Sequence, residues 1–391
     1  MTFEFEHAQA DRFVEHFEGR REQVLALTRS LVETESPSGD GEGSRAVVDL
    51  LVVEARGLGL HTSVERLAAP DGYGEHLRIR VGTDNTGGGK SILILGHTDT
   101  VHPRGTLAER PWREAEGRIY GPGVFDMKAS CALALEALRA RGEVAKGMAR
   151  PVVLLLTCDE EAGSMSGRAL VEEEARRAEY VLVLEPPAPG GRVKTARKGT
   201  GYFRLAVEGV AAHAGLEPEK GASAVLEISR QIERLHALND AARGTTVNVG
   251  VVCGGTRSNV VAAAARAEVD VRFGTLEEAR RIEETIRALR PFDPRTSLKV
   301  EGGVNRPPLE RTPAVARLYE HARRLASLLG FELGEASVGG ASDGNFAAAC
   351  GAPVLDGLGV EGDGAHAAHE HIVADRLVSR GALLASLLTT L

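Results

Sequence analysis

Short apolar runs alternate with helix-like periodicity in the first half of the chain. The runs SILILG (91–96), PVVLLLT (151–157) and YVLVLE (180–185) have the length of strands, and their continuous apolar character is typical of strands buried on both faces of a largely parallel sheet. Between the first two runs, apolar residues fall on one stripe of a helix: Met127, Cys131, Ala134, Leu135 and Leu138. This alternation predicts a three-layer α/β domain, preceded by helices over 8–35 and 42–57.

The pattern changes after the Pro/Gly-rich segment PPAPGGR, which is typical of a break between units. Strands are then predicted near 202–209, 246–252, 267–273 and 297–302, and helices near 221–238 and 275–289. Two helices against about four strands predict an α+β sandwich of about 110 residues, which is large enough to fold as a unit. A second break, GGVNRPPLERTP, closes this unit. The helix predicted over 313–329 and the elements that follow it could return to the first domain.

Composition and charge exclude several classes of protein. With 47 Lys+Arg against 55 Asp+Glu, the formal net charge of −8 argues against a nucleic-acid partner. No apolar run approaches the ~20 residues of a membrane helix, and the N-terminal MTFEFEHAQADRFVEHFEGRREQ lacks the apolar core of a secretory signal. The four cysteines are scattered, so we expect buried free thiols in a reducing cytoplasm. The chain is therefore expected to be soluble and cytoplasmic.

Acidic residues and a histidine follow the ends of successive predicted strands. They are His97 and Asp99 after the first run, Asp126 in the turn GVFDMKAS, Glu160 and Glu161 after the second run, and Glu185 at the end of the third. Because the carboxyl ends of the strands form the ligand-binding edge of an open α/β sheet, these side chains should converge. Crowded carboxylates need a compensating positive charge, and a His–carboxylate mixture suits zinc or its transition-metal neighbours. Each residue alone would more simply be a cap or a solvated group; their joint placement favours a metal site, and their number a pair of metals.

The motifs GHTDTVHP, GPGVFDMK, TCDEEAGS, YVLVLEPP and GAHAAHEHI, in this order and spacing, resemble those of the co-catalytic zinc amidohydrolases. That family includes aminoacylase-1, acetylornithine deacetylase, succinyl-diaminopimelate desuccinylase and bacterial glutamate carboxypeptidase, and the resemblance spans about Ser36 to Ile372. It implies an α/β/α zinc-peptidase core, residues 1–198 and 308–391, with an inserted α+β sandwich lid (dimerisation) domain, residues 199–307. It also implies two Zn²⁺ per chain, with Co²⁺ or Mn²⁺ as substitutes.

The resemblance assigns roles to single residues. The metal ligands would be His97 and Glu185 for the first metal, Glu161 and His366 for the second, and Asp126 as the bridge between both. Asp99 resembles the residue that orients the ligand histidine and sets its tautomer. Glu160 resembles the general base, which takes a proton from the bridging water and passes it to the leaving amine.

The motifs differ from the family pattern at one place and leave a choice of histidine at another. Ala129-Ser130 follow the DMK triplet where the family usually has Gly-Gly, a change that bears on helix packing but leaves the bridging carboxylate in place. The C-terminal motif offers three histidines, His366, His369 and His371. The motif's glutamate favours His366, because Glu370 falls four residues after it; His369 is the alternative.

Substrate-binding roles are also implied by the resemblance. His213, in EGVAAHAGLEPEK, matches a lid histidine that holds the substrate carbonyl or carboxylate and in dimeric relatives reaches the neighbouring subunit's site. Asn259 and Arg272 are 13 residues apart, as in the glutamate carboxypeptidases, and Arg272 would bind a substrate carboxylate through two parallel hydrogen bonds. Gly340 and Ser342 lie in GGASDGNFAA, which resembles a loop that completes the pocket. The simpler alternatives are a surface turn for His213 and a surface ion pair for Arg272.

These patterns lead to an expected function. The chain is expected to hydrolyse the amide of an N-acyl amino acid or small peptide with a free carboxylate, in a glutamate-carboxypeptidase-like manner, with Glu160 activating the water. The alternatives are an acetylornithine-deacetylase or aminoacylase-type deacylase, an inactive binding protein on the same fold, and a structural zinc protein. The intact Glu160 argues against the binding protein, and the predominance of carboxylates over cysteines against the structural site. The expected partner is a small-molecule substrate, not nucleic acid or membrane, and any homodimer is expected to form through the lid.

Overall fold

The chain folds into two compact units. The computed structural model describes residues 6–59, 61–82, 90–145 and 150–391, so the first five residues used in the localisation prediction lie outside it. The first unit comprises Met1–Thr195, Arg311–Ser337 and Ser342–Leu391, and the second Ala196–Glu310 and Val338–Ala341. The predicted division, 1–198 and 308–391 against 199–307, differs from these bounds by three residues at each junction and also at Val338–Ala341. At Val338, the carbonyl accepts from Lys198 N–H (3.0 Å). The role of the second unit as a lid stays a prediction.

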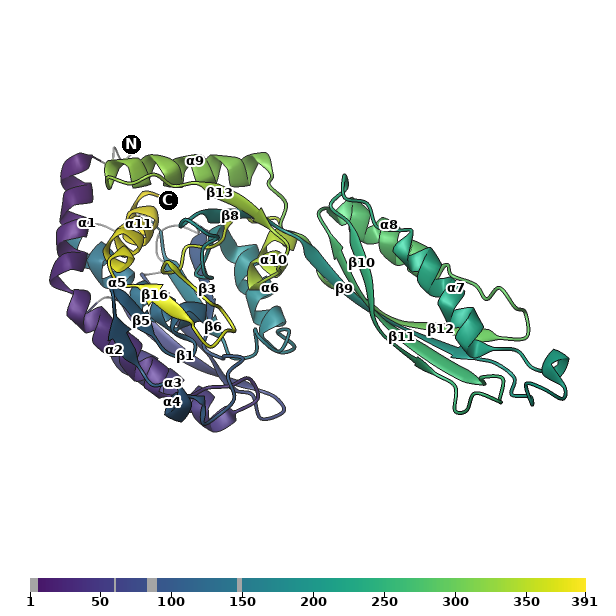
Figure 1. Cartoon of the computed structure of the whole chain (residues 1–391). Helices are drawn as coiled ribbons and strands as arrows, with labels where there is room; N and C mark the ends of the chain where they lie inside the picture. Colours follow the sequence, from purple (N-terminus) through teal and green to yellow (C-terminus); the bar gives the residue numbers. More distant parts are fainter. Residues whose placement is uncertain (1–5, 60, 83–89, 146–149) are drawn as a thin grey trace. The chain divides into compact units, whose positions relative to one another are not determined.

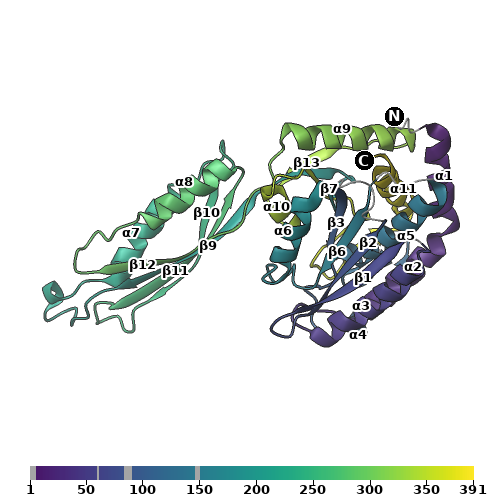
Figure 2. The ribbon, with the colours of Figure 1, turned by 180° about the vertical axis from the view of Figure 1, so that it is seen from behind.

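A six-stranded sheet forms the centre of the first unit, in the order β1-β2-β6-β3-β7-β14 (Figures 1 and 2). The strands are β1 (Thr62–Ala69), β2 (Gly74–Val81), β3 (Ser91–His97), β6 (Val152–Thr157), β7 (Ala178–Val183) and β14 (Val354–Leu355). β6, β3, β7 and β14 run parallel, and β2 and β1 extend the sheet antiparallel. Every residue of β3 and β6 is buried, which confirms the interpretation of the apolar runs.

Helices cover both faces of this sheet, which confirms the three-layer α/β prediction. On one side lie α1 (His7–Gly19), α2 (Arg21–Glu33), α3 (Gly41–Arg56), α5 (Ala129–Val144) and α11 (Arg376–Thr390); on the other lie α6 (Gly167–Arg177) and α10 (Asp343–Ala349), with α9 (Pro313–Leu328) packed against β14 and α11 (Figure 1). The prediction of one helix over 8–35 is wrong, because two helices, α1 and α2, are separated at Arg20. Glycine at position 19 weakens the helix there, and Arg20 leaves helical geometry (φ −110°, ψ 6°) while its Nε donates to Glu136 (3.1 Å).

Short strands that the sequence did not predict bring the C-terminal region to the turn before α5. They are β4 (Arg113–Ala115), β5 (Arg118–Tyr120), β15 (Gly362–Asp363) and β16 (His371–Val373), in the order β15-β16-β5-β4. His371 pairs with Tyr120 in this sheet. The pairing fixes the segment that contains His366 next to the segment that contains Asp126. The remaining short elements are α4 (Thr106–Glu109) and the strand pair β8 (Val193–Arg197) and β13 (Glu335–Val338).

The second unit is an antiparallel sheet with two helices on one face. Its strands are β9 (Gly199–Glu208), β10 (Thr246–Gly254), β11 (Ala264–Phe273) and β12 (Ser297–Arg306), in the order β10-β11-β9-β12, and its helices are α7 (Ala224–His236) and α8 (Leu276–Arg287). Phe203 and Leu205 of β9 pack in one core with Ile228 of α7 and Ile282 of α8. The four strands and two helices predicted for this region are all present, with longer strands than predicted.

The cysteines are free but are not all buried. Cys131 and Cys158 are buried and Cys350 is partly buried, whereas Cys253 is exposed. The prediction fails for Cys253 because it lies on β10, an edge strand of the second sheet. Among the described residues, no helix is both long and apolar enough to span a membrane.

A buried arginine ties α11 to the loops around it. Arg380 is 1 % exposed, and its guanidinium donates to the carbonyls of Gly359 (2.9 Å), Gly191 (3.1 Å) and Gly357. Arg380→Met should lower the free energy of unfolding by about 3 kcal/mol or more, because two buried carbonyls and one partly buried carbonyl lose their donor. Urea denaturation measures this loss. Arg376→Met, an exposed change on the same helix, should cost less than about 0.5 kcal/mol, and equal losses for both variants would contradict this role of Arg380.

Candidate metal centre

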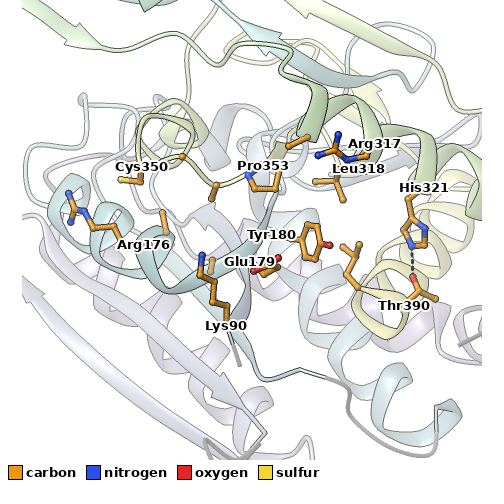
Figure 3. Close-up of a pocket in the computed structure, with 16 residues that line it drawn as sticks. Lys90, Arg176, Glu179, Tyr180, Arg317, Leu318, His321, Cys350, Pro353 and Thr390 are labelled. Carbon is orange, nitrogen blue, oxygen red and sulfur yellow. Dashed lines mark hydrogen bonds between the residues drawn. The ribbon is translucent and has the colours of Figure 1, made fainter. Parts of the chain in front are cut away.

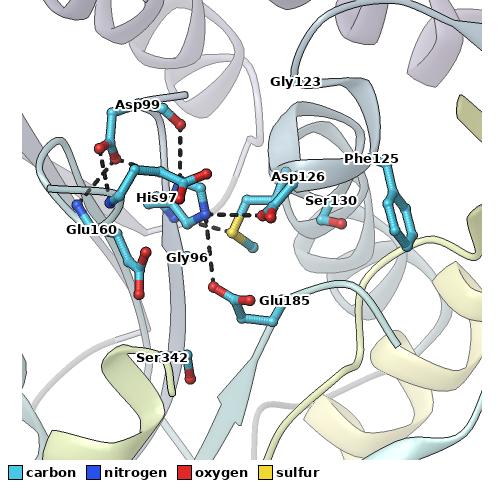
Figure 4. A network of polar contacts seen from close by, with 12 residues as sticks. Gly96, His97, Asp99, Gly123, Phe125, Asp126, Ser130, Glu160, Glu185 and Ser342 are labelled. Carbon is cyan, nitrogen blue, oxygen red and sulfur yellow. Dashed lines mark hydrogen bonds and ion pairs between the residues drawn. The ribbon is translucent and has the colours of Figure 1, made fainter. Parts of the chain in front are cut away.

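Neighbouring parallel strands deliver the candidate ligands to one edge of the first unit's sheet. His97 is the last residue of β3, Glu160 and Glu161 follow β6, and Glu185 follows β7. The Nε2 atom of His97 lies 3.7 Å from Oε1 of Glu185, and Figure 4 shows the side chains of His97, Glu160 and Glu185 turned toward a common space. The convergence expected from the strand ends is therefore present in the structure.

Asp126 lies between the two histidines of the cluster. It belongs to the turn Val124–Lys128, has non-helical geometry (φ −120°, ψ 89°) and precedes a cis peptide bond to Met127. Its Oδ1 lies 3.2 Å from Nε2 of His97, and its Oδ2 lies 3.4 Å from Nε2 of His366. The two oxygens thus face different histidines, which is the arrangement that a bridging carboxylate requires.

His366 completes the cluster from the loop between β15 and β16. Its backbone has a positive φ of 64°, and its Nε2 lies 3.1 Å from Oε1 of Glu161. His371 instead packs against Tyr120 and its Nδ1 contacts the His369 carbonyl (2.9 Å). The structure thus places His366, the favoured histidine of the three, next to Asp126 and Glu161.

Two overlapping sets of side chains could each hold a metal ion. In the sets His97–Glu160–Glu185 and His97–Asp126–Glu161, the potential ligand atoms lie within 4.8 Å of one another. The donors are imidazole nitrogens and carboxylate oxygens, which suit zinc and its transition-metal neighbours. Glu160, expected only as a base, is thus close enough to count among the ligand groups.

The electrostatics of the cluster favour a positive charge. Burial lowers the pKa of His97, but hydrogen bonds to Asp126 and Asp99 outweigh it and hold this pKa well above the usual value. Hydrogen bonds to Asp126 and Glu161 raise the pKa of His366 to about 10. Burial raises the pKa of Asp126, yet the hydrogen bonds with His366 and His97 bring it below the usual range. A metal cation supplies the same positive charge and leaves each imidazole neutral, which is the form that binds metal.

Asp99 is a buried residue that contacts three residues of the cluster, His97, Glu160 and Glu161. Its carboxylate is 2 % exposed and accepts hydrogen bonds from Ser38 Oγ (2.6 Å) and from the backbone N–H groups of Glu161 (3.1 Å) and Glu160 (3.2 Å). Figure 4 shows Asp99 beside Glu160 and His97. Nδ1 of His97 lies closer to the Asp99 backbone carbonyl (3.0 Å) than to its carboxylate (3.4 Å). Both oxygens are acceptors, so Nδ1 carries the proton and Nε2 presents its lone pair to the cluster. The tautomer is thus set mainly by the backbone carbonyl, and the carboxylate also positions the two glutamates.

The substrate-binding residues predicted in the second unit form two separate places. His213 bridges to Val260 and Ala214 N–H donates to the Asn259 carbonyl (3.0 Å), so the His213 and Asn259 segments lie together near the start of β11. Arg272 lies near the opposite end of that strand. There it forms a bidentate ion pair with Asp270 (2.8 and 2.9 Å), which is the simpler alternative considered for it.

The loop residues Gly340 and Ser342 have local partners. The Gly340 carbonyl accepts from Arg197 (3.2 Å). The Ser342 hydroxyl caps α10 at Gly344 N–H and donates to Asp356 (2.7 Å), while its own N–H donates to Asn345 (2.9 Å). The polar groups of Ser342 are thus used within the fold, because it is the N-cap of a helix, and a substrate-binding role for the loop stays a prediction.

A cavity of about 570 Å³ in the first unit is separate from the metal cluster (Figure 3). Lys90, Tyr180 and Pro353 are among the residues that line it. Because Lys90 precedes β3 and Tyr180 lies near the start of β7, this cavity lies at the amino ends of the strands. His97 lies at the carboxyl end of β3, so the cavity does not belong to the candidate site.

Sequence reasoning missed three contacts that support the cluster. Met127 Sδ accepts from the His97 N–H (3.3 Å), Glu370 contacts Nε2 of His102 (2.6 Å), and Glu370 accepts from the backbone N–H of Asp126 (3.0 Å). Both Glu370 and His102 occur in the quoted motifs. Their position there was the only signal, since their partners are far away in the sequence.

A three-layer α/β fold with histidines and carboxylates gathered at the strand ends is an arrangement that suits a metal-dependent hydrolase. A family model described as "Peptidase family M20/M25/M40" matches residues 93–390, and the chain belongs to this family. The family resemblance drawn from the motifs is thereby confirmed, as is the expectation of a peptidase or amidohydrolase.

Curated relatives and solved structures agree with this assignment. The chain is 32 % identical to carboxypeptidase G2 of Pseudomonas sp. (strain RS-16) over 347 residues, covering 88 % of this chain and 83 % of that protein. It is 31 % identical to an acetylornithine deacetylase of Myxococcus xanthus over 249 residues, covering 58 % and 62 %. The fold resembles the crystal structure of aminopeptidase PepT from Bacillus cereus ATCC 10987, with a TM-score of 0.78, 23 % identity and coverage of 95 % and 98 %.

Proposed function

We propose that this protein is a zinc-dependent carboxypeptidase that hydrolyses the amide bond of N-acyl amino acids or small peptides with a free carboxylate, and that acyl-glutamates are its preferred class. The observation that carries the metal-dependent chemistry is the meeting of His97, Asp126 and Glu161 at the strand ends, with Glu185 and His366 beside them. The similarity to carboxypeptidase G2 over most of the chain supports the carboxypeptidase preference.

The roles of the side chains follow from their positions. His97 and Glu185 would hold one Zn²⁺, Glu161 and His366 the other, and Asp126 both. The two ions would supply the charge that lowers the pKa of a bound water and polarises the amide carbonyl. Glu160 would take the proton of that water and deliver it to the leaving nitrogen, as a general base and then a general acid. Co²⁺ and Mn²⁺, which accept similar ligands, are proposed as substitutes.

We also propose that the active protein is a homodimer formed through the second unit. β10 is an edge strand on which Val251 and Val252 are 50 % and 56 % exposed, and Leu226 of α7 is 52 % exposed. An open strand edge flanked by apolar side chains is a template for pairing with another chain.

A cytoplasmic location stays a prediction from the sequence.

The separation of the substrate-binding residues also supports a dimer. Asn259 precedes β11 and Arg272 lies near its end, and at about 3.3 Å per residue the strand alone separates their segments by about 26 Å. One small substrate cannot contact both ends of a single copy. In the proposed dimer, the His213–Asn259 end and the Arg272 end of the second unit would bind different substrate molecules.

A substrate panel tests the preference. We expect N-acyl-L-glutamate to be hydrolysed with a kcat/KM at least about tenfold above that for N-acetyl-L-ornithine, because the motifs around Asn259 and Arg272 resemble those of the glutamate carboxypeptidases. The acetylornithine deacetylases among the relatives make that deacylase activity the second candidate. Equal rates, or a preference for acetyl-ornithine, would reject the glutamate preference, and binding without turnover across the panel would favour an inactive binding protein.

A further inference from the structure

Glu370 is a buried carboxylate that joins the C-terminal loop to the turn that carries Asp126. Only 3 % of Glu370 is exposed. Its Oε1 accepts from the backbone N–H groups of Phe125 (2.9 Å) and Asp126 (3.0 Å). Its Oε2 accepts from the N–H of Gly123 (2.8 Å) and from Nε2 of His102 (2.6 Å). An ionised carboxylate can accept about four hydrogen bonds, so all of its capacity is used here.

Neighbouring groups hold this carboxylate in its acceptor role. The Arg110 guanidinium lies 3.4 Å from Nδ1 of His102, and since arginine only donates, Nδ1 must be the acceptor. His102 therefore carries its proton on Nε2, the nitrogen that faces Glu370. Arg110 also donates to the carbonyl of Ala367 (3.3 Å), the residue after His366, so the same network reaches the loop of the second histidine ligand.

We propose that Glu370 is a positioning residue that fixes two metal ligands on distant segments, Asp126 and His366, relative to each other. The proposal rests on the proposed function, because it takes both residues as ligands. Glu370 bonds the backbone of Asp126 itself and belongs to the loop that presents His366. The two ligand side chains approach to 3.4 Å, although the His366 side chain is half-exposed.

The test variant is Glu370→Gln, which keeps the shape of the side chain. Its amide NH₂ replaces one acceptor with a donor and would face N–H groups in either orientation. An NH₂ on the Oε1 side meets the N–H groups of Phe125 and Asp126, and one on the Oε2 side meets the N–H groups of Gly123 and His102. We expect the zinc affinity to fall about 10- to 100-fold, the range found when residues that hydrogen-bond to metal ligands are changed. Titration of the metal-free protein with zinc against a chromophoric chelator measures this.

A matched control is Glu174→Gln. Glu174 lies on α6 and is 1 % exposed. It accepts hydrogen bonds from Arg78 (2.7 Å) and Arg80 (2.6 Å), which lie on strand β2 and not at the metal cluster. It should lower the unfolding temperature of the metal-free protein and leave the zinc affinity unchanged. His102→Phe is the second variant, to be used if Glu370→Gln does not fold, and should lower the zinc affinity about fivefold, the equivalent of one hydrogen bond.

The outcomes separate the two proposals. A selective loss of zinc affinity in Glu370→Gln, against Glu174→Gln, supports the positioning role. If the unmodified protein binds zinc and Glu370→Gln binds it as tightly, the positioning role is wrong and the proposed function stands. If the unmodified protein binds no zinc, the proposed function and the positioning role are both overturned.

Discussion

Replacing Glu160 with glutamine should lower kcat by about 10²–10⁴ while the protein keeps its metal, because a neutral amide cannot take the proton of the attacking water. Glu160 is only 8 % exposed, and its position is fixed through its backbone N–H, which donates to Asp99 (3.2 Å). That bond does not involve the side chain, so Glu160→Gln should leave the position of Glu161 unchanged. Steady-state kinetics on an acyl amino acid, with metal content measured on the same sample, gives both quantities.

The control for this variant is Glu172→Gln on α6. Glu172 pairs with Arg168 (2.7 Å) on the surface, and its loss should leave kcat within about twofold, as surface changes usually do. If Glu160→Gln retained a near-normal kcat with metal bound, the base would have to be another group. If it lost metal as well, Glu160 would be a ligand, as its place in the His97–Glu160–Glu185 set allows.

Replacing Asp126 with alanine should remove metal from the protein. Its two oxygens face His97 (3.2 Å) and His366 (3.4 Å), so one change withdraws a ligand from both proposed metal positions. We expect the zinc content to fall from about two per chain to less than one, with loss of turnover, because a two-metal site needs its bridge. Elemental analysis of protein purified without chelator measures the content directly.

Asp375→Ala is the matched control for this change, since its side chain is 84 % exposed and pairs with Arg21 at the surface (3.0 Å). It should keep the zinc content of the unmodified protein. An unchanged zinc content in Asp126→Ala would reject the bridging role, whatever the effect on turnover.

The sequence predicted the positions of the cluster because the underlying signals are local. The runs that became β3, β6 and β7 are apolar without interruption, and parallel neighbours necessarily bring residues such as His97 and Glu185 to the same edge. In the second unit, helix and strand periodicities were equally clear, as in α8, whose Ile282 and Ile286 face the core.

The parts that were missed depend on contacts that no local pattern contains. β1 mixes charged and partly buried residues, so it lacks the apolar run that marked the central strands. Arg20, where the first helix ends, contacts Glu136 far along the chain. Glu370 and Gly123 are likewise distant in the sequence, so the support of the Asp126 turn became visible only in three dimensions. The exposure of Cys253 follows from the strand order, which periodicity does not give.

The most direct test of the proposed zinc-dependent hydrolysis measures metal content and turnover together. Protein purified without chelator is analysed for zinc, assayed on N-acyl-L-glutamate, stripped with a chelator, and assayed again after zinc or cobalt is returned. About two zinc ions per chain are expected, with turnover lost on stripping and restored by either metal. Turnover that survives complete removal of metal, or a protein that neither binds metal nor hydrolyses any acyl amino acid, would contradict this expectation.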